Sequence, residues 1–227
     1  MERAKLADSR GSIHDIEFAP NHLGLKLASC SADGMLRIYE AMDAANLADW
    51  TLMDEFEVVA GGSKESEGLY CVSWCQSRVD PQMLVVGCGR DNTAKIYRLD
   101  AHNKWQAFES LGGHSDAVCD VAWAPTMGRT YHLIASASKD GHVRIFKLSE
   151  TNHASGTTGL TTGQPKKRYR VDLIADFSDH QAEVWRVEWN ITGTILSSSG
   201  DDGKIRLWKA SFLDDWKLIS VIAAEKQ

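Results

Sequence analysis

Two sets of residues contain the side chains that hydrolases use for nucleophilic catalysis, a histidine, a serine and an aspartate. One set is His180, Ser198 and Asp202, and the other is His114, Ser136 and Asp140. A catalytic set needs an exposed nucleophile and an oxyanion hole beside it. Here each aspartate instead lies in a turn between two strand-like runs, where Asp followed by Gly is favoured because glycine adopts positive φ without steric cost. We therefore expect both sets to be structural hydrogen-bond chains, and we expect no enzymatic activity.

The first set has a fourth member, and the second set does not. Trp208 stands six residues after Asp202, and its indole N–H can donate to the hydroxyl of Ser198. Phe146 occupies the corresponding position after Asp140 and has no donor, so that chain ends one bond short. The turn aspartates Asp33 and Asp91 have no matching histidine. The first two units are therefore expected to depend more on packing.

The turn aspartate belongs to a pattern that recurs four times along the chain. Each aspartate stands six residues before an aromatic residue. Each also follows an earlier aromatic residue, which ends a strand-like run. The turn residues are Asp33, Asp91, Asp140 and Asp202, the later aromatics are Tyr39, Tyr97, Phe146 and Trp208, and the earlier aromatics are Phe18, Trp74, Trp123 and Trp189. Alternating apolar residues in the runs are typical of β-strands. Repeated four-stranded units, somewhat longer than the ~40–45 residues of an ordinary blade, predict an all-β fold, a β-propeller.

We divide this single partial propeller domain, residues 1–227, into four blades. They are residues 11–60, 68–112, 113–178 and 179–224. Residues 150–168 are rich in Thr, Gly and Ser, which predicts a flexible loop inside the third blade. Residues 1–10 are the candidate outer strand of a preceding blade.

Composition excludes several classes of function. Of 227 residues, 43% are hydrophobic and 25% charged, which is ordinary for a globular domain, and the net charge is −6. Direct nucleic-acid binding is not expected, since it needs clustered Lys and Arg. No apolar run reaches membrane-spanning length and no signal-peptide core precedes the domain, so membrane insertion is not expected either. The five cysteines lack zinc-ligand spacing and are predicted to be buried reduced thiols, and no metal or cofactor is expected.

The repeated units resemble WD repeats, with Trp208-Lys209 where that family often has Trp-Asp. More narrowly, the chain resembles the Seh-type nucleoporins. The residues that carry this resemblance are HDIEFAPNHLGLKLASCSADGMLRIYEA (14–41), DVAWAPTMGRTYHLIASASKD (120–140) and VWRVEWNITGTILSSSGDDGKIRLWKA (184–210). A related WD-repeat protein of the COPII outer coat shares the VW-x-V-x-W frame, but we expect it to lack the NITGT and SSGDDG segments.

The resemblance implies an open six-bladed propeller, of which this chain holds four blades and lacks about two at its N-terminus. It implies that a larger α-helical scaffold nucleoporin donates a strand-rich segment that completes the propeller. The partners would be this nucleoporin and other subunits of the Y-shaped complex of the nuclear pore, which supports nucleocytoplasmic transport. A second location is implied in a vacuolar or lysosomal complex that regulates nutrient signalling. The last blade would border the gap, so its edge is the expected partner-binding region, with contact residues unassigned.

Two alternatives to the hypothesis of a non-catalytic scaffold remain. One is the WD-repeat protein of the COPII vesicle coat. The other is a propeller adaptor that reads a peptide on its top face, which requires Arg and aromatic side chains to converge around the mouth of the channel.

Overall fold

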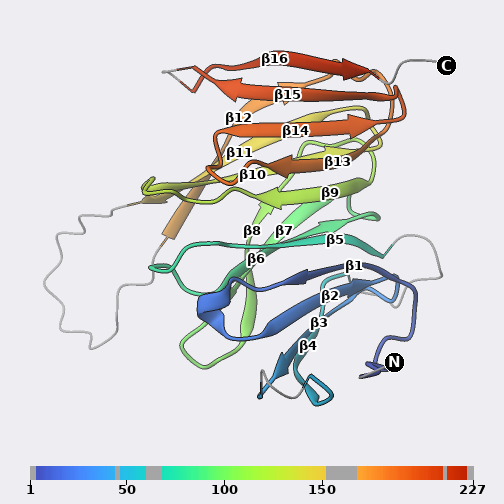
Figure 1. Ribbon diagram of the computed structural model, residues 1–227, viewed down its shortest axis with the longest axis vertical. Coiled ribbons are helices and arrows are strands. Elements are labelled where there is room, and N and C mark those ends of the chain that lie inside the picture. Colours follow the sequence, from blue (N-terminus) through green and yellow to red (C-terminus); the bar gives the residue numbers. More distant parts are fainter. Residues whose placement is uncertain (1–3, 44–46, 60–67, 152–167, 212–213, 224–227) are drawn as a thin grey trace, which may run out of the picture.

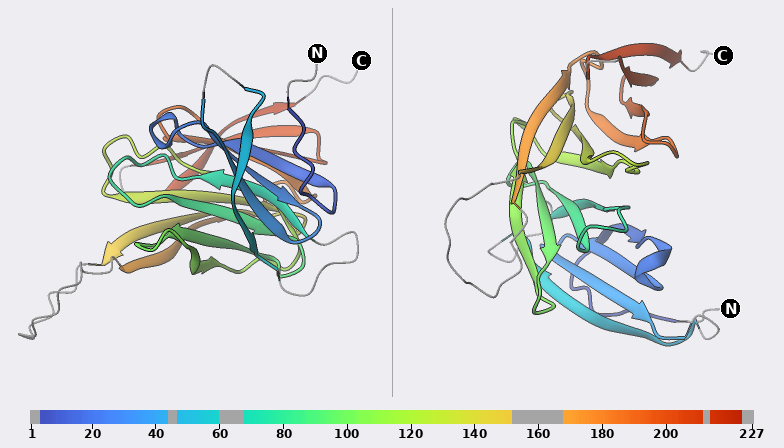
Figure 2. Two further views of the ribbon diagram at one scale, coloured as in Figure 1. Left: turned by 90° about the horizontal axis from the view of Figure 1, so that it is seen from below. Right: turned by 90° about the vertical axis from the view of Figure 1, so that its left-hand side faces the viewer.

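The computed structural model describes residues 4–43, 47–59, 68–151, 168–211 and 214–223. Within these ranges the chain forms four antiparallel sheets of four strands each, and each sheet is built from strands consecutive in the sequence. Figure 1 shows the sheets stacked from the first blade to the last. In the right-hand view of Figure 2 they follow an open arc, with the first and last blades at its two ends. The predicted all-β propeller with four blades present is confirmed, and it is not closed.

Each blade is an up-and-down meander. The first blade contains β1 (Ile13–Phe18), β2 (Lys26–Ser31), β3 (Met35–Ala41) and β4 (Trp50–Glu57), with the short 3-10 helix η1 (Asn21–Leu23) after β1. The second contains β5 (Leu69–Trp74), β6 (Met83–Cys88), β7 (Thr93–Leu99) and β8 (Trp105–Leu111). The third contains β9 (Val118–Trp123), β10 (Tyr131–Ser138), β11 (Val143–Thr151) and β12 (Arg168–Phe177). The fourth contains β13 (Val184–Trp189), β14 (Ile195–Gly200), β15 (Lys204–Ala210) and β16 (Trp216–Ala223).

The turn between the second and third strands of each blade explains the recurring aspartate. In three blades the residue after it is a glycine with positive φ, namely Gly34 (φ 79), Gly141 (φ 83) and Gly203 (φ 67). In the second blade Asn92 takes this place with φ 51. Asparagine is among the few residues other than glycine that tolerate this conformation. The turn geometry is therefore the same in all four blades despite the change of residue.

The first strand of every blade, which is its innermost strand (β1, β5, β9 and β13), carries a β-bulge at its second residue. The pairing with the neighbouring strand skips His14, Tyr70, Cys119 and Trp185. A bulge bends the strand locally and re-aims the side chain of the extra residue. The four bulged residues occupy equivalent positions at the start of the innermost strands.

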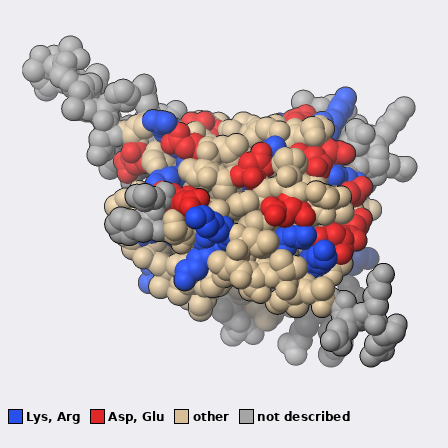
Figure 3. Space-filling view, turned by 90° about the horizontal axis from the view of Figure 1, so that it is seen from above, with Lys and Arg blue, Asp and Glu red and all other residues tan. Residues whose placement is uncertain are grey.

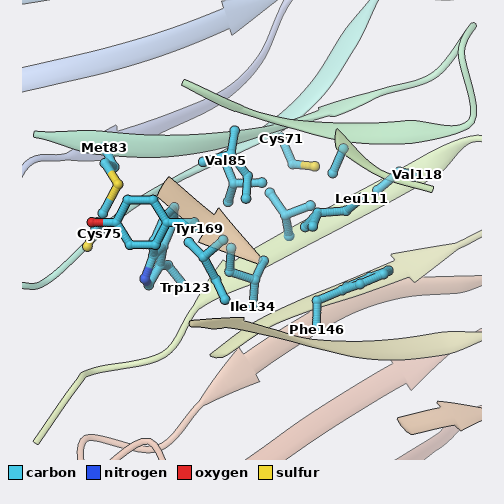
Figure 4. Close-up of a cluster of buried hydrophobic side chains, with 14 residues drawn as sticks. Cys71, Cys75, Met83, Val85, Leu111, Val118, Trp123, Ile134, Phe146 and Tyr169 are labelled. Carbon is cyan, nitrogen blue, oxygen red and sulfur yellow. The ribbon is translucent and has the colours of Figure 1, made fainter. Parts of the chain in front are cut away.

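The hydrophobic core lies between successive blades. One cluster joins the second blade to the third and includes Met83, Val85 and Leu111 from one sheet and Trp123 and Ile134 from the other (Figure 4). Equivalent clusters join the first blade to the second and the third to the fourth. Full burial of one such side chain contributes about 1.5–3 kcal/mol. Each blade is therefore stabilised mainly by its neighbour.

Several sequence-based expectations concern segments at the edges of the blades. Residues 4–12 form no strand, and this segment contacts the first blade: the backbone N–H of Arg10 donates to Asp33 at 3.0 Å, and the Tyr39 hydroxyl donates to Asp8 at 3.1 Å. The outer strand proposed at 1–10 stays a prediction. Strand β11 ends at Thr151 and β12 begins at Arg168, and the rest of the predicted loop at 150–168 lies outside the described residues. The cysteines are buried and free, as expected: Cys30, Cys71, Cys75, Cys88 and Cys119. Among the described residues, no helix has the length and apolarity needed to cross a membrane.

Both ends of the arc leave a blade face without a neighbour. Ile205, the third residue after the turn aspartate of the last blade, is 44% exposed, whereas its equivalents in the other blades are fully buried: Leu36, Ala94 and Val143. At the other end Phe18 is 57% exposed, whereas its equivalents are at most 8% exposed: Trp74, Trp123 and Trp189. Contiguous exposed apolar surface of this kind promotes association.

We predict that the isolated chain self-associates, because each copy presents two uncovered sheet faces. Light scattering coupled to gel filtration should give a mass above that of one chain, or a polydisperse profile. A stable monomer that resists proteolysis would contradict the prediction.

Candidate functional site

The fourth blade holds a continuous chain of hydrogen bonds from the indole of Trp208 to the turn aspartate. Trp208 Nε1 donates to Ser198 Oγ at 2.8 Å. Ser198 Oγ lies 2.8 Å from Nε2 of His180, whose Nδ1 lies 3.0 Å from an oxygen of Asp202. The bonds to Ser198 and Asp202 are both made when the histidine is neutral and carries its proton on Nδ1; Arg206 Nη1, which also lies 2.7 Å from Nδ1, then donates to Asp202 instead. The structure thus brings all four sequence-predicted residues together.

Burial and charge keep this histidine neutral. Burial lowers the pKa of His180, and the positive charge of Arg206 lowers it further, against the opposing effect of Asp202. Burial would raise the pKa of Asp202, but the hydrogen bonds from Arg206 and His180 outweigh it and hold this pKa at about 2. The chain therefore ends on a carboxylate.

The third blade contains the shorter version. His114 Nε2 lies 2.7 Å from Ser136 Oγ, and its Nδ1 lies 3.0 Å from an oxygen of Asp140. Phe146 is buried at the position equivalent to Trp208, and an unsubstituted aromatic ring cannot donate a hydrogen bond. Here too the structure places all three predicted residues in contact.

The first blade has a network that sequence analysis missed. The buried guanidinium of Arg37 donates to Ser31 Oγ at 2.9 Å and to Asp33 at 2.8 Å, and it also pairs with Glu55 at 2.7 Å. The expectation that this blade depends more on packing did not include this polar network. Arginine replaces histidine here because its five donors can satisfy several acceptors at once.

A basic residue four positions after each turn aspartate is the signal that could have revealed these networks. The residues are Arg37, Lys95, Arg144 and Arg206. Arg206 pairs with Asp202, and Arg144 lies 3.6 Å from Asp140. In the second blade Lys95 bonds Asp91 at 2.6 Å and the carbonyl of Val58 in the preceding blade at 3.1 Å. The basic residue thus contacts the turn carboxylate in every blade.

The geometry argues against nucleophilic catalysis. Ser198 and Ser136 are each 1% exposed, so a substrate cannot reach either hydroxyl. Each hydroxyl bonds a buried histidine, and Ser198 also accepts from Trp208, so neither lies in an open site. The arrangement holds the turn between the second and third strands to the loop that precedes the innermost strand.

A second group of polar side chains joins one blade to the next. Asp15 accepts the backbone N–H of Val72 at 3.0 Å, and Glu17 accepts that of Trp74 at 2.9 Å. At the following interfaces Ser73 accepts from Trp123 at 3.1 Å, and Asp120 accepts from Val187 at 2.9 Å. All four acceptors lie on innermost strands and all four donors lie on the innermost strand of the next blade. These bonds fix the register between neighbouring blades.

The carboxylates among these acceptors are held in an unfavourable environment for charge. Burial raises the pKa of Glu17 to about 8 and that of Asp120 to about 7, and it also raises the pKa of Asp15. In each case backbone N–H donation opposes the shift without cancelling it. The blade interfaces therefore contain acids that titrate near neutral pH.

The outward face of the last blade is the third feature of the site. Ile205 on β15 pairs in register with Ile222 on β16, and both are exposed. Leu207 and Ile195 lie on the same face and are partly buried. Figure 3 looks onto this end of the arc, where uncharged surface lies between separate acidic and basic groups. The expected partner-binding edge thus includes an apolar sheet face.

Replacing His180 with alanine removes two hydrogen bonds and leaves Ser198 and Asp202 without this partner. We expect the variant to be destabilised by about 1–3 kcal/mol, the usual effect of breaking a buried network. Chemical denaturation at one fixed protein concentration measures this, with His102→Ala, at an exposed position, as the control. An unchanged unfolding midpoint would show that the network does not stabilise the blade.

Glu17→Gln should change how stability depends on pH. Because the pKa of Glu17 is higher in the folded protein, the folded state binds the proton more tightly than the unfolded state, and this contribution is lost as pH rises toward about 8. The glutamine side chain does not titrate, so the variant should lose less stability than the parent between about pH 5.5 and about pH 8.5. Glu188→Gln, at an exposed position on β13, is the control. Equal losses in parent and variant would contradict the assignment.

Comparison with known proteins agrees with this architecture. The family model described as WD domain, G-beta repeat matches residues 3–40, 105–147 and 171–209. Nucleoporin seh1 of Schizosaccharomyces pombe is 45% identical over 100% of this chain and 69% of its own length. Nucleoporin SEH1 of Saccharomyces cerevisiae is 39% identical over 97% of this chain and 70% of its own length, and the Homo sapiens protein of that name is 40% identical over 98% and 60%.

The predicted resemblance is confirmed by these identities, which extend over almost the whole chain. The WD-repeat match agrees with the structure, in which four-stranded blades with a turn aspartate repeat along an open arc. The chain belongs to the Seh1 nucleoporin family of WD-repeat proteins.

Proposed function

We propose that this chain is a non-catalytic scaffold subunit of the Y-shaped complex of the nuclear pore, located at the nuclear envelope. In this role its last blade binds a strand-rich segment donated by a larger α-helical nucleoporin. The observation that carries the proposal is the exposure of Ile205 at a position that is fully buried in the three other blades. The face is built like a blade interface and lacks its covering sheet.

The chemistry of the face favours a sheet as its occupant. Every covered blade face in the described structure packs against another four-stranded sheet, and the outward face of the last blade repeats the same pattern of apolar positions. Two positions differ, since Ser197 and Ser199 replace the alanines of the third blade, Ala135 and Ala137. A more polar face of this kind is typical of a contact between separate chains, whose interfaces are about as polar as ordinary surface.

The identity of the partner is supported by the family. The relatives named above are nucleoporins, and the family resemblance implies that the covering segment comes from an α-helical scaffold subunit, with other Y-complex subunits as neighbours. In the vacuolar or lysosomal nutrient-signalling complex that the resemblance also implies, the same face would bind the corresponding subunit. Support for transport between nucleus and cytoplasm follows from the scaffold role.

A charged residue on the uncovered face should abolish partner binding. In Ile205→Asp a carboxylate would be buried against the donated sheet without a partner, and the cost of burying an unpaired charge should reduce recovery of the helical nucleoporin more than tenfold. Affinity capture of the tagged chain from cells, quantified by mass spectrometry, measures this. Ile191→Asp is the control, because Ile191 is exposed in the turn between β13 and β14.

Two results of the capture would contradict the proposal. Equal recovery of the helical nucleoporin with the parent chain and with Ile205→Asp would show that this face does not bind it. Recovery of the parent chain with vesicle-coat subunits alone would favour the COPII alternative.

A further inference from the structure

The innermost strands carry a series of contacts between blades, and the last blade holds one member of the series that has no partner in the described structure. The residue before the final aromatic of each innermost strand is, in blade order, Glu17, Ser73, Ala122 and Glu188. The Glu17 carboxylate accepts the backbone N–H of Trp74 at 2.9 Å, and the Ser73 hydroxyl accepts that of Trp123 at 3.1 Å. Glu188 places a carboxylate at the same position on the last blade.

Glu188 lies on the same sheet face as Ile205. It pairs in register with Ser197, which in turn pairs with Leu207. Directly paired residues on neighbouring strands project from the same face, and so do residues two apart on one strand. The side chain of Glu188 is exposed, and among the described residues no donor bonds its carboxylate. The uncovered face thus includes an acceptor that is not used within the chain.

The position two residues earlier cannot continue the series. Asp15 and Asp120 stand there in the first and third blades, and each accepts a backbone N–H from the innermost strand of the next blade. Arg186 stands there in the last blade, and a guanidinium has no acceptor. It lies 3.7 Å from Asp120 of the preceding blade. Of the two positions, only Glu188 can therefore accept a backbone N–H from a covering strand.

An aromatic residue supplies the N–H in the equivalent contacts. The rings of Trp74 and Trp123 are buried in the clusters between blades, beside the backbone N–H groups that donate. Trp74 also donates its indole N–H to the backbone carbonyl of Glu17 at 3.2 Å. In the last blade the hydroxyl of Ser197 already donates to the corresponding carbonyl, that of Glu188. The bond to the carboxylate is therefore the one that a covering strand can repeat.

We propose that Glu188 fixes the register of the partner segment on the last blade, as Glu17 does for β5. The inference rests on the scaffold function proposed above and adds the chemistry of the covering segment. An aromatic residue at the end of an extended strand donates its backbone N–H to the Glu188 carboxylate. Its ring then packs on the apolar positions of the face, which include Leu207 and Ile205.

The surroundings of Glu188 favour a backbone N–H over other donors. Arg186 projects from the same face, and its positive charge disfavours a lysine or an arginine of the partner at this point. Glu188 also belongs to no cluster of three or more metal-ligating side chains among the described residues. A backbone N–H is uncharged, and it is the donor that the equivalent acceptors bind in the covered blades.

The experiment uses the tagged 227-residue chain in cells, with the recovered helical nucleoporin quantified by mass spectrometry. Glu188→Ala removes the acceptor and should lower the recovery about tenfold, the usual effect of losing one hydrogen bond to a charged group. Glu188→Gln keeps an amide oxygen that accepts, so it should restore most of the recovery. Asp179→Ala removes an exposed acid in the loop before β13 and should be recovered with the nucleoporin as the parent is.

Two further measurements separate register from stability. The unfolding midpoint of the isolated chain should be the same for Glu188→Ala and the parent, because no donor within the described chain bonds this carboxylate. Benzoylphenylalanine in place of Leu207 should crosslink to an aromatic residue of the partner or to its neighbour in a strand. Leu207 is equivalent to Ile38, which lies in the same buried cluster as Trp74.

The outcomes distinguish this inference from the scaffold proposal. Normal recovery with Glu188→Ala, together with loss of recovery in Ile205→Asp, would overturn the role of Glu188 and leave the scaffold proposal standing. Normal recovery with Ile205→Asp would overturn both. Equally low recovery with Glu188→Gln and Glu188→Ala would overturn the hydrogen bond in favour of an ion pair with a cation of the partner.

Discussion

The structure depends on the covering of each blade's apolar face by the next blade. A four-stranded sheet on its own has no interior, and each cluster of buried side chains in the described part of the chain spans two sheets. Removing apolar surface from water contributes about 25 cal/mol per Å², so an uncovered face forgoes much of the stabilisation that the covered faces provide. Leu36, Ala94 and Val143 show what a covered face looks like, and Ile205 shows the same position without a cover. The proposed binding of a partner sheet to this face rests on this difference.

Polar contacts supplement this packing in two ways. Within a blade, the turn aspartate and a basic or histidine side chain hold the hairpin to the preceding loop, as Asp202 and His180 do. Between blades, a side chain of one innermost strand accepts a backbone N–H of the next, as Glu17 does from Trp74. The last blade, which has a neighbour on one side only, has the longest internal chain, ending at Trp208.

Much of the fold was readable from the sequence, because turn chemistry and strand periodicity are local properties. The six-residue spacing from Asp202 to Trp208 predicts a turn at the aspartate and a strand that ends near the buried aromatic residue. The role of Glu17 was not readable, since an acid that alternates with apolar residues in a strand has the pattern of a solvent-facing position. Only the packing of the next blade shows that its carboxylate is partly buried and accepts a backbone N–H. The bulges at Tyr70 and Trp185 could not be predicted for a related reason, because they depend on strand pairing.

The basic residues illustrate a signal that was present and not used. Arg37 and Arg206 each stand four positions after a turn aspartate. This spacing places the arginine and its aspartate at the same end of a hairpin. Their pairing with the turn carboxylate needs no information from distant parts of the chain. The uncovered faces could be predicted only in outline, because exposure at Ile205 depends on the arrangement of whole blades.

The most direct test of the central claim is a photo-crosslink from the uncovered face in living cells. The photoreactive amino acid benzoylphenylalanine replaces Ile205, and the crosslinked products are identified by mass spectrometry. If the proposed partner covers this face, the crosslink should join position 205 to a strand-rich segment of an α-helical nucleoporin, because a sheet from that partner would lie against this side chain. Crosslinks only to vesicle-coat subunits, or none above the level seen with the same amino acid at Ile191, would contradict the account.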